Sequence, residues 1–381
     1  MEKVKVLELP ISNLGRGGTE VMVWNWYHNF SSPELVIDFL GDYSRNDEYI
    51  KSINSNHGEY YKYTKYTSPK IFGKIINTFG IMRYAKKIAK NNDYDVIHIH
   101  AQDAFIAFTY YLAVKPFCKK IIIHSHCTGT DVNSGVLMKL KRFLHKVCRC
   151  LLNSKKVIRL ACSKAAGEWM YPPKYKFEVI NNGIDVKKFT YNEEVRNRIR
   201  SELKVDNKFV IGNIGRFSIQ KNHEFLLDIF NEVLKKNPNA VLLLIGDGPL
   251  ENKIKEKIKN LGIEKSVIFY GTTSSTNELY QAMDCFVLSS LFEGLPIVLI
   301  EAQAAGLKTL CSDAITQEAK ITGLLEYLPL SGTQEKWAEK ILSYNDRYER
   351  KDLFKEVKNA GYDIKQSAKR LEEIYVRKMH E

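Results

Sequence analysis

The feature that most constrains the fold is a regular alternation of short apolar runs with longer segments of helical length along most of the chain. Runs such as Val4–Leu9, Val96–His100 and Ile121–His124 predict buried strands, and a helix-length segment follows each of them. Strands that alternate with helices are typical of a parallel sheet with helices on both faces. We therefore expect an α/β protein built on doubly wound parallel sheets.

Turn residues interrupt this alternation at Asn181-Asn182-Gly183-Ile184-Asp185, and it restarts with the apolar run Val210–Gly215. A chain of 381 residues is also too long for a single hydrophobic core. We predict an N-terminal Rossmann-like domain at residues 1–185 and a second one at residues 186–360. Helical sequence runs from about Gln334 to Met379, and its last part, 361–381, could cross back to the first domain.

Composition indicates a globular protein of a reducing compartment. No apolar run approaches the roughly 20 residues that a membrane-spanning helix needs, and the first residues read directly into a strand instead of a signal peptide. The seven cysteines are scattered and include no C-x-x-C pair, which argues against a zinc site or a disulfide framework. We expect a cytoplasmic protein with reduced thiols.

Positive charge is concentrated in the first half of the chain. Residues 1–185 carry 27 Lys and Arg against 16 Asp and Glu, which accounts for +11 of the net charge of +13. Within this half, Met138–Arg159 alternates basic with apolar residues and predicts an amphipathic helix. Such a helix can lie on an anionic membrane or pack on the core with a solvated outer face, and the charge excess favours the membrane.

Two carboxylates flank a predicted helix start in the run Glu293-Gly294-Leu295-Pro296-Ile297-Val298-Leu299-Ile300-Glu301. Eight positions are a little over two turns of an α-helix, so both acids could face one ligand. Gly294 allows close approach of the backbone, and Pro296 suits the first helical turn. The free N–H groups of a helix start also form a ready site for phosphate.

Two cations follow the predicted strand that ends at Gly215. Arg216 and Lys221 are five positions apart, so both could reach a diphosphate, the arginine as a bidentate fork and the lysine as a point charge. Taken alone, two solvated surface cations are an equally good interpretation of this pattern.

Glycine turns follow several other predicted strands. Gly17 and Gly18 open a helix, Gly246 follows a strand in the second half, and Gly271 and Thr272 follow the next. None of these turns matches G-x-G-x-x-G or G-x-x-x-x-G-K-[ST], which argues against a nicotinamide cofactor and against ATP hydrolysis. Structural turns without a ligand remain the alternative.

Candidate metal ligands are weak in this sequence. Asp93 and Asp95 precede a predicted strand, where aspartates commonly form turns. His98 and His100 share one face of a strand, but we identify no third ligand near them. His126 follows another strand, and no Ser/His/Asp order suggests a hydrolytic triad. We predict no metal site.

The run from Glu293 to Glu301 resembles the E-x7-E signature of the retaining family 4 glycosyltransferases, which have the GT-B fold of two Rossmann-like domains facing a central cleft. The resemblance implies that Glu293 holds hydroxyls of the transferred sugar and Glu301 those of the ribose. It implies that Arg216 and Lys221 bind the diphosphate and that His126 lies beside the donor sugar. The segments implied to approach or line the nucleotide site are Gly17, Gly18, Gly246, Gly271, Thr272, Gly294, Leu295, Pro296 and Ile297.

The strongest likeness is to glycosyltransferases of bacterial exopolysaccharide and capsule synthesis. It implies transfer of a hexose or N-acetylhexosamine from a nucleotide sugar, UDP-linked by preference, to a lipid-linked oligosaccharide, in exopolysaccharide, capsule or lipopolysaccharide synthesis. No cofactor is expected, and the basic N-terminal domain would lie on the inner face of the cell membrane. Two alternatives stay open: a nonhydrolysing nucleotide-sugar epimerase, which would need no acceptor, and a basic nucleic-acid-binding protein, which would need stacking platforms or a recognition helix.

Overall fold

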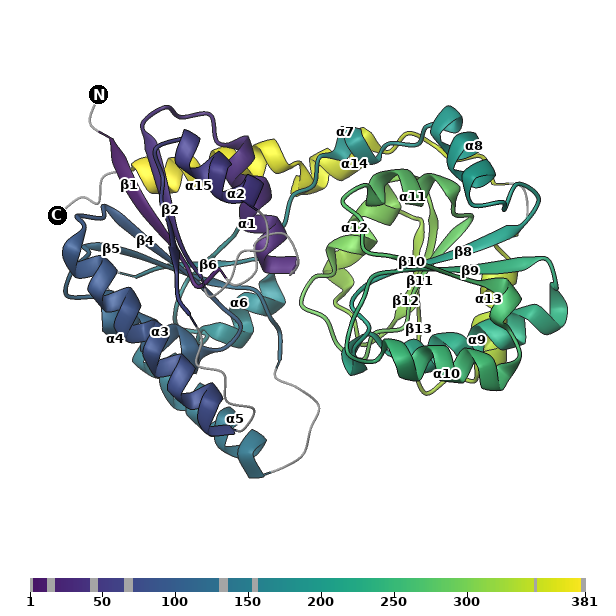
Figure 1. The fold of residues 1–381 in the computed structure, drawn as a ribbon, viewed down its shortest axis with the longest axis horizontal. Helices are drawn as coiled ribbons and strands as arrows, with labels where there is room; N and C mark the ends of the chain where they lie inside the picture. The colour runs from purple at the N-terminus through teal and green to yellow at the C-terminus, as the bar shows by residue number, and fades with distance from the viewer. Residues whose placement is uncertain are drawn as a thin grey trace. The chain divides into compact units, whose positions relative to one another are not determined.

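The computed structural model describes residues 3–11, 18–41, 47–64, 71–129, 136–152, 157–345 and 348–377. The chain divides into two compact units, the first made of Met1–Gly183 with Ile364–Glu381 and the second of Ile184–Asp363 (Figure 1). Sequence analysis placed the corresponding limits at residues 185 and 360.

Unit 1 is built on a seven-stranded parallel sheet with the order β3-β2-β1-β4-β5-β6-β7. Its central strands β4 and β5 are buried along their whole length, as expected of strands that helices cover on both faces. The strands are β1 (Val4–Leu9), β2 (Leu35–Gly41), β3 (Tyr60–Lys62), β4 (Val96–Ala101), β5 (Lys120–Ser125), β6 (Val157–Ala161) and β7 (Glu178–Val179).

Helices connect these strands and cover both faces of the sheet (Figure 1). Two of them begin at ordinary side-chain caps, since Asp103 accepts from the N–H of Ile106 and Ser163 from that of Ala166. None of the described helices is both long and apolar enough to cross a membrane. The helices are α1 (Gly18–Asn29), α2 (Asp47–Ser55), α3 (Ile71–Asn91), α4 (Ala104–Val114), α5 (Val136–Leu151), α6 (Lys164–Met170) and α15 (Ile364–Val376).

Unit 2 repeats the plan with a six-stranded parallel sheet of order β10-β9-β8-β11-β12-β13. Its strands are β8 (Phe209–Ile214), β9 (Ala240–Ile245), β10 (Val267–Gly271), β11 (Cys285–Leu288), β12 (Lys308–Ser312) and β13 (Leu325–Leu328). The α-helices are α7 (Val186–Phe189), α8 (Glu193–Glu202), α9 (His223–Lys236), α10 (Glu251–Leu261), α11 (Thr276–Ala282), α12 (Ile297–Ala304), α13 (Gln334–Leu342) and α14 (Phe354–Val357). The prediction of doubly wound parallel sheets is confirmed.

Each sheet reverses its strand order once, and this reversal locates the candidate site of each unit. In unit 1 the reversal lies between β1 and β4, and in unit 2 between β8 and β11. Ligands of doubly wound sheets bind beyond the carboxyl ends of the strands at such a point. The loops that follow these four strands are therefore the first places to look for function.

The structure differs from the sequence-based elements at several short segments, and two of these differences concern edge strands and the helical tail. Strands β3 and β13 were not predicted, because both are short and partly exposed edge strands with no continuous apolar run. The single helical tail predicted from Gln334 to Met379 is wrong, since helix α13 ends at Leu342 and Gly361 has a φ of 85°, which breaks the helix before α15.

Helix α15 packs on unit 1. Trp26 of α1 donates its indole N–H to Ser367 Oγ at 3.1 Å, and the buried Glu372 accepts the backbone N–H groups of Ser31 and Ser32 at 2.6 Å each. Lys120 donates to carbonyl oxygens of the last turn of the helix, including that of Tyr375 at 2.9 Å. These contacts bring the end of the described chain to strand β5 of the first sheet.

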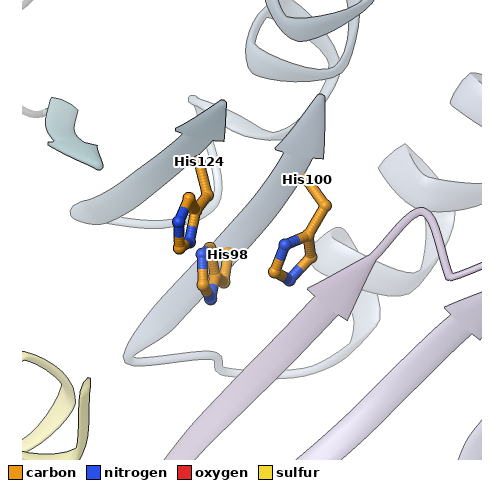
Figure 2. A group of neighbouring side chains, drawn as sticks. All are labelled: His98, His100 and His124. Atoms are coloured by element: carbon orange, nitrogen blue, oxygen red, sulfur yellow. The ribbon is translucent and has the colours of Figure 1, made fainter. Parts of the chain in front are cut away.

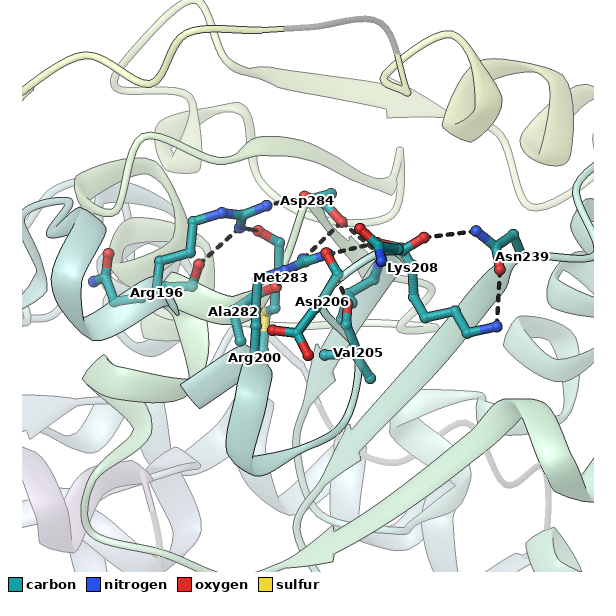
Figure 3. A network of polar contacts seen from close by, with 12 residues as sticks. Arg196, Arg200, Val205, Asp206, Lys208, Asn239, Ala282, Met283 and Asp284 are labelled. Carbon is teal, nitrogen blue, oxygen red and sulfur yellow. Dashed lines mark hydrogen bonds and ion pairs between the residues drawn. The ribbon is translucent and has the colours of Figure 1, made fainter. Parts of the chain in front are cut away.

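Asp284 secures the amino end of β11 in unit 2. Its carboxylate accepts from Arg196 at 2.5 Å, from Arg200 at 3.1 Å and from the backbone N–H of Val210 at 2.7 Å (Figure 3). Arg200 in turn donates to backbone carbonyls, among them that of Lys208. This network ties helix α8 to β8 and β11, the two strands whose opposite ends carry the candidate site.

Candidate functional site

Lys221 and Glu293 meet at the strand reversal of unit 2. Lys221 Nζ lies 2.6 Å from Glu293 Oε1, and Ser290 donates its hydroxyl to the same oxygen at 3.0 Å. Only 15% of the lysine side chain and 11% of the glutamate side chain are exposed, so the pair is much less screened than a surface ion pair. The cation predicted to bind diphosphate is therefore next to the acid predicted to hold the sugar.

Gln220 fixes the loop that carries Glu293, a role that sequence analysis missed. Its backbone carbonyl accepts the N–H of Leu291 at 2.8 Å, and its side-chain amide donates to the carbonyl of Phe292 at 3.0 Å. The two bonds join the segment after β8 to the segment after β11. These hydrogen bonds hold in place the loop that brings Glu293 to Lys221.

Helix α12 begins at Ile297, one residue later than sequence analysis placed it. Pro296 occupies the capping position with a φ of −72° and a ψ of 109°, and its carbonyl accepts the N–H of Leu299 at 3.0 Å. Gly294 precedes it in a partly buried loop, whereas the Leu295 side chain packs into the core. The helix start that was predicted to face a phosphate is present directly after Glu293.

Glu301 lies on α12 beyond that start and is partly buried. Tyr280 of α11 donates its hydroxyl to Glu301 Oε2 at 2.9 Å. Burial raises the pKa of Glu301 from 4.5 to about 7, against the opposing effects of the Tyr280 hydroxyl and of Lys188. Near neutral pH this acid is therefore poised between its two protonation states. Tyr280 has no sequence signal that would have identified it as a partner.

The loops after β8, β9 and β10 are joined by backbone hydrogen bonds. Gly246 donates to the carbonyl of Gly271 at 2.9 Å, and Phe217 donates to that of Asp247 at 2.7 Å. A Cβ at Gly246, where φ is 139°, would lie 2.2 Å from the carbonyl oxygen of Gly215, so only glycine fits. Gly271 has a φ of 81° and open space around it.

The remaining predicted contacts of unit 2 are exposed. Arg216 and Thr272 both lie at the surface, directly after β8 and β10. Because the loops of these strands are joined, both residues lie on the same edge of the sheet as the Lys221–Glu293 pair. This edge combines cations, carboxylates and exposed backbone, the groups that a nucleoside diphosphate requires.

Unit 1 has a histidine cluster at its own strand reversal. His98 and His100 of β4 and His124 of β5 have ring nitrogens that lie within 4.8 Å of one another (Figure 2). His126 follows β5, and its Nε2 is 2.9 Å from His100 Nδ1. The premise that His98 and His100 lack a third neighbour was therefore wrong. Sequence analysis also missed Glu8, whose carboxylate lies 2.6 Å from His100 Nε2.

Hydrogen bonds already use half of the six ring nitrogens of His98, His100 and His124. Both nitrogens of His100 are engaged, and His98 Nδ1 lies 2.6 Å from the hydroxyl of Tyr375. Among the described residues, only His98 Nε2 and the two His124 nitrogens of this trio lack a hydrogen-bond partner. Within this trio two histidines have available nitrogens, which is fewer than the three or four ligands of a zinc site, and His126, whose Nδ1 also lacks a partner among the described residues, is not part of the trio. The arrangement favours a polar network.

The glycine turn after β1 is only partly within the described residues. Gly17 lies outside them. Gly18 is the first residue of α1, is exposed and has no atom within 4 Å of an added Cβ. Within the part of the chain that the structure describes, nothing near Gly18 requires a glycine.

Comparison with known proteins connects these features to one family. The model for Glycosyltransferase Family 4 matches residues 17–188, and the model for Glycosyl transferases group 1 matches residues 195–360. The chain is 31% identical over 378 residues to the glycosyltransferase EpsF of Bacillus subtilis (strain 168), covering 96% of this chain and 94% of the relative.

Two further matches are more distant. Over 241 residues the chain is 28% identical to the UDP-Gal:alpha-D-GlcNAc-diphosphoundecaprenol alpha-1,3-galactosyltransferase of Escherichia coli, covering 60% of each protein. The solved structure of Anabaena Alr3699/HepE in complex with UDP-glucose has a TM-score of 0.71 at 19% identity, covering 97% of this chain and 98% of that one. With two parallel-sheet units and two matching family models, the chain belongs to the family 4 glycosyltransferases of GT-B fold.

Proposed function

We propose that this glycosyltransferase moves a hexose or N-acetylhexosamine from a UDP-sugar to a lipid-linked oligosaccharide, with retention of anomeric configuration. The observation that carries the proposal is the contact of Lys221 with Glu293 at the strand reversal of unit 2. The two residues would then contact neighbouring parts of one ligand, with Lys221 at the leaving diphosphate and Glu293 at the sugar hydroxyls. The relative that acts on a diphosphoundecaprenol-linked sugar supports the acceptor class.

In this mechanism the leaving diphosphate develops negative charge as its bond to the sugar breaks. Lys221, the exposed Arg216 and the N–H groups that follow Gly294 stabilise that charge. These groups supply the positive potential that a divalent cation provides in other transferases, so we propose a reaction without a metal cofactor. The acceptor hydroxyl attacks from the face of the departing diphosphate, and its proton passes to a phosphate oxygen.

The two acids have separate proposed roles. Glu293, held by Lys221 and Ser290, accepts hydrogen bonds from hydroxyls of the transferred sugar. Glu301 accepts hydrogen bonds from the ribose hydroxyls. These bonds replace the hydrogen bonds with water that its partial burial removes. His126 of unit 1 is proposed to contact the transferred sugar, and Gly246, Gly271 and Thr272 to line the nucleotide.

Donor choice is the first experiment. Thermal unfolding with UDP, GDP and their sugars should show stabilisation by UDP compounds, because a ligand that binds only the folded state raises the melting temperature. Lys221→Met should remove most of that stabilisation, whereas Lys235→Met, which removes an exposed cation of α9, should leave it unchanged. Stabilisation by GDP-sugars alone would refute the choice of UDP.

Helix α5 supports a peripheral position on the inner face of the cell membrane. Its inner face is buried at His145 and Cys148, yet four apolar side chains at helical spacing remain exposed. These are Leu140 at 51%, Phe143 at 62%, Val147 at 41% and Leu151 at 52%. Exposed Lys139, Arg142 and Lys146 border this stripe, which is the pattern of a helix lying in an anionic lipid interface.

Vesicle binding tests this position. The protein should sediment with vesicles containing anionic phospholipid, and Phe143→Asp should weaken binding roughly tenfold or more because it removes apolar burial and adds a repelled charge. Val179→Asp, at a residue that is 38% exposed on β7, is the matched control. Equal binding by the two variants would contradict the assignment of α5.

A further inference from the structure

A chain of hydrogen bonds connects Glu8 in the middle of the unit 1 sheet to His126 in the loop after β5. Glu8 Oε2 lies 2.6 Å from His100 Nε2, and the other nitrogen of His100 lies 2.9 Å from His126 Nε2. Glu8 and His100 are 2% and 4% exposed, so water does not compete for these bonds. The contacts span three segments, β1, β4 and the loop after β5.

The protonation states of the three groups follow from their surroundings. Burial would raise the pKa of Glu8, but the neighbouring His98 and the hydrogen bonds that His100 and His98 make to the carboxylate hold it well below its usual value. Burial, with the neighbouring His98, lowers the pKa of His100 to about 4. Burial and the other histidines also place the pKa of His126 well below its usual value. At neutral pH, Glu8 is an anion while His100 and His126 are uncharged.

These states leave a single arrangement of protons. An ionised carboxylate only accepts hydrogen bonds, so His100 must carry its proton on Nε2, which faces Glu8. A neutral imidazole has one proton, and His100 Nδ1 is therefore an acceptor. His126 Nε2, which faces that acceptor, must then carry the proton of His126. Glu8 thus determines the tautomer of a histidine two hydrogen bonds away.

Other groups around the Glu8–His100–His126 hydrogen bonds are consistent with this arrangement of protons. Tyr375 of α15 donates its hydroxyl to Glu8 Oε1, so it supports the carboxylate as an acceptor. His98 approaches Glu8 Oε2 with its Nδ1 at 3.2 Å. His124 of β5 stacks against His126 with ring centroids 4.4 Å apart and also lies between Trp26 and the cluster. None of these neighbours supplies a donor to His126 Nδ1.

His126 Nδ1 is buried and has no hydrogen-bond partner among the described residues. The backbone of the same residue is fixed, because its N–H donates to the carbonyl of Ala101 at 3.1 Å. A buried acceptor without a partner costs about 1–3 kcal/mol, so a bound group that donates to it gains that energy. Sugar hydroxyls are donors of this kind.

We propose that Glu8 and His100 are positioning residues that hold His126 in the Nε2–H tautomer, so that its Nδ1 accepts a hydrogen bond from a hydroxyl of the transferred sugar. This inference rests on the proposed function, which brings a nucleotide sugar to His126. Glu8 and His100 do not touch the substrate themselves. They act through the imidazole of His126.

The tautomer can be measured in the unmodified protein. The chain has nine histidines, and two-bond ¹H–¹⁵N correlation spectra of protein labelled in the imidazole nitrogens report which nitrogen of each carries the proton. The signal absent from His126→Asn identifies His126. We expect the Nε2–H form at pH 7.5, and an Nδ1–H form or an imidazolium would overturn the proposal.

The variant Glu8→Gln tests whether Glu8 determines the tautomer of His126. A glutamine amide can donate to His100 Nε2, which would move the His100 proton to Nδ1 and make His126 Nε2 an acceptor. We expect an Nδ1–H population at His126 and a loss of roughly tenfold in kcat/KM for the UDP-sugar, the effect of one lost hydrogen bond. Affinity for UDP, which lacks the sugar, should not change.

Asp38→Asn is the matched control, because Asp38 is also a buried carboxylate of the unit 1 sheet, bonded to the Tyr94 hydroxyl at 2.7 Å and away from the histidines. It should leave the tautomer and kcat/KM unchanged. A Glu8→Gln protein with wild-type tautomer and kinetics, or an equal kinetic loss in both variants, would refute the positioning role of Glu8 and His100. Absence of any transfer by the wild-type protein would refute the proposed function instead, whatever tautomer His126 adopts.

Discussion

Replacing Glu301 by glutamine should stabilise the unliganded protein above neutral pH. Burial raises the pKa of this acid from 4.5 to about 7 in the folded state. Between these two values the folded state binds more protons than the unfolded state, so stability falls as the pH rises through that range. The difference corresponds to about 3 kcal/mol, present as a penalty at pH 8 and absent at pH 4.5. A neutral glutamine, which can still accept from Tyr280, avoids the penalty.

The assay is thermal unfolding of the wild type and Glu301→Gln at pH 5 and pH 8 without nucleotide. A gain of about 3 kcal/mol in a unit of this size raises the melting temperature by roughly 6–12 °C, and this gain should appear at pH 8 and fall to about a quarter of its size at pH 5. Glu326→Gln is the matched control, because Lys340 and Tyr344 counteract burial and lower the pKa of Glu326. That variant should gain nothing at pH 8.

The same residue should make UDP binding depend on pH. Ribose hydroxyls donate to a carboxylate, so binding favours the ionised form, and UDP affinity should increase as the pH rises from 6 to 8. Glu301→Gln should bind UDP more weakly at pH 8 despite its higher stability. An equal melting temperature of variant and wild type at pH 8, or a gain of the same size at pH 5, would refute the reasoning about Glu301.

Three further predictions concern unit 2. Arg216→Ala should weaken UDP binding roughly tenfold in titration calorimetry, because an exposed charge-assisted contact to phosphate is lost; an unchanged affinity would remove Arg216 from the site. Gly246→Ala should lower the free energy of unfolding by about 1–3 kcal/mol, because the new Cβ meets the Gly215 carbonyl at 2.2 Å; Gly262→Ala, with open space at a φ of 69°, should cost less. Asp284→Ala should cost roughly 2–3 kcal/mol, because Arg196 and Arg200 lose their shared acceptor; the exposed Asp206→Ala should stay within about 0.5 kcal/mol of wild type.

The buried strands could be predicted because their sequence carries the signal directly. A strand covered on both faces is apolar at most of its positions, and Ala240–Ile245 is apolar at all of them, so its run is recognisable without knowledge of its neighbours. The edge strand Leu325–Leu328 is only four residues long, is interrupted by Glu326 and is partly exposed, so it has neither a continuous apolar run nor a regular alternation that would distinguish it from a loop. The helical tail was wrong because helix-forming composition continues across Gly361, where the backbone turns.

The candidate site was predictable where its residues follow strands and not where they meet across the fold. Glu293, Arg216 and Lys221 follow β8 and β11 within a few residues, and a charge directly after an apolar run is visible in the sequence. Tyr280 reaches Glu301 from another helix, which no local pattern indicates. Glu8 had a weak signal, a carboxylate inside the strand Val4–Leu9, but its partner His100 is 92 residues away.

The most direct test of the central claim is the anomeric configuration of the transferred sugar. Purified protein is incubated with an α-linked UDP-sugar and a diphosphate-linked lipid saccharide, and the anomeric proton coupling of the product is measured by NMR. The account predicts an α-linked product from the wild type and none from Glu293→Ala, whose circular dichroism spectrum and melting transition should show a folded protein. A β-linked product, or full transfer by Glu293→Ala, would contradict it.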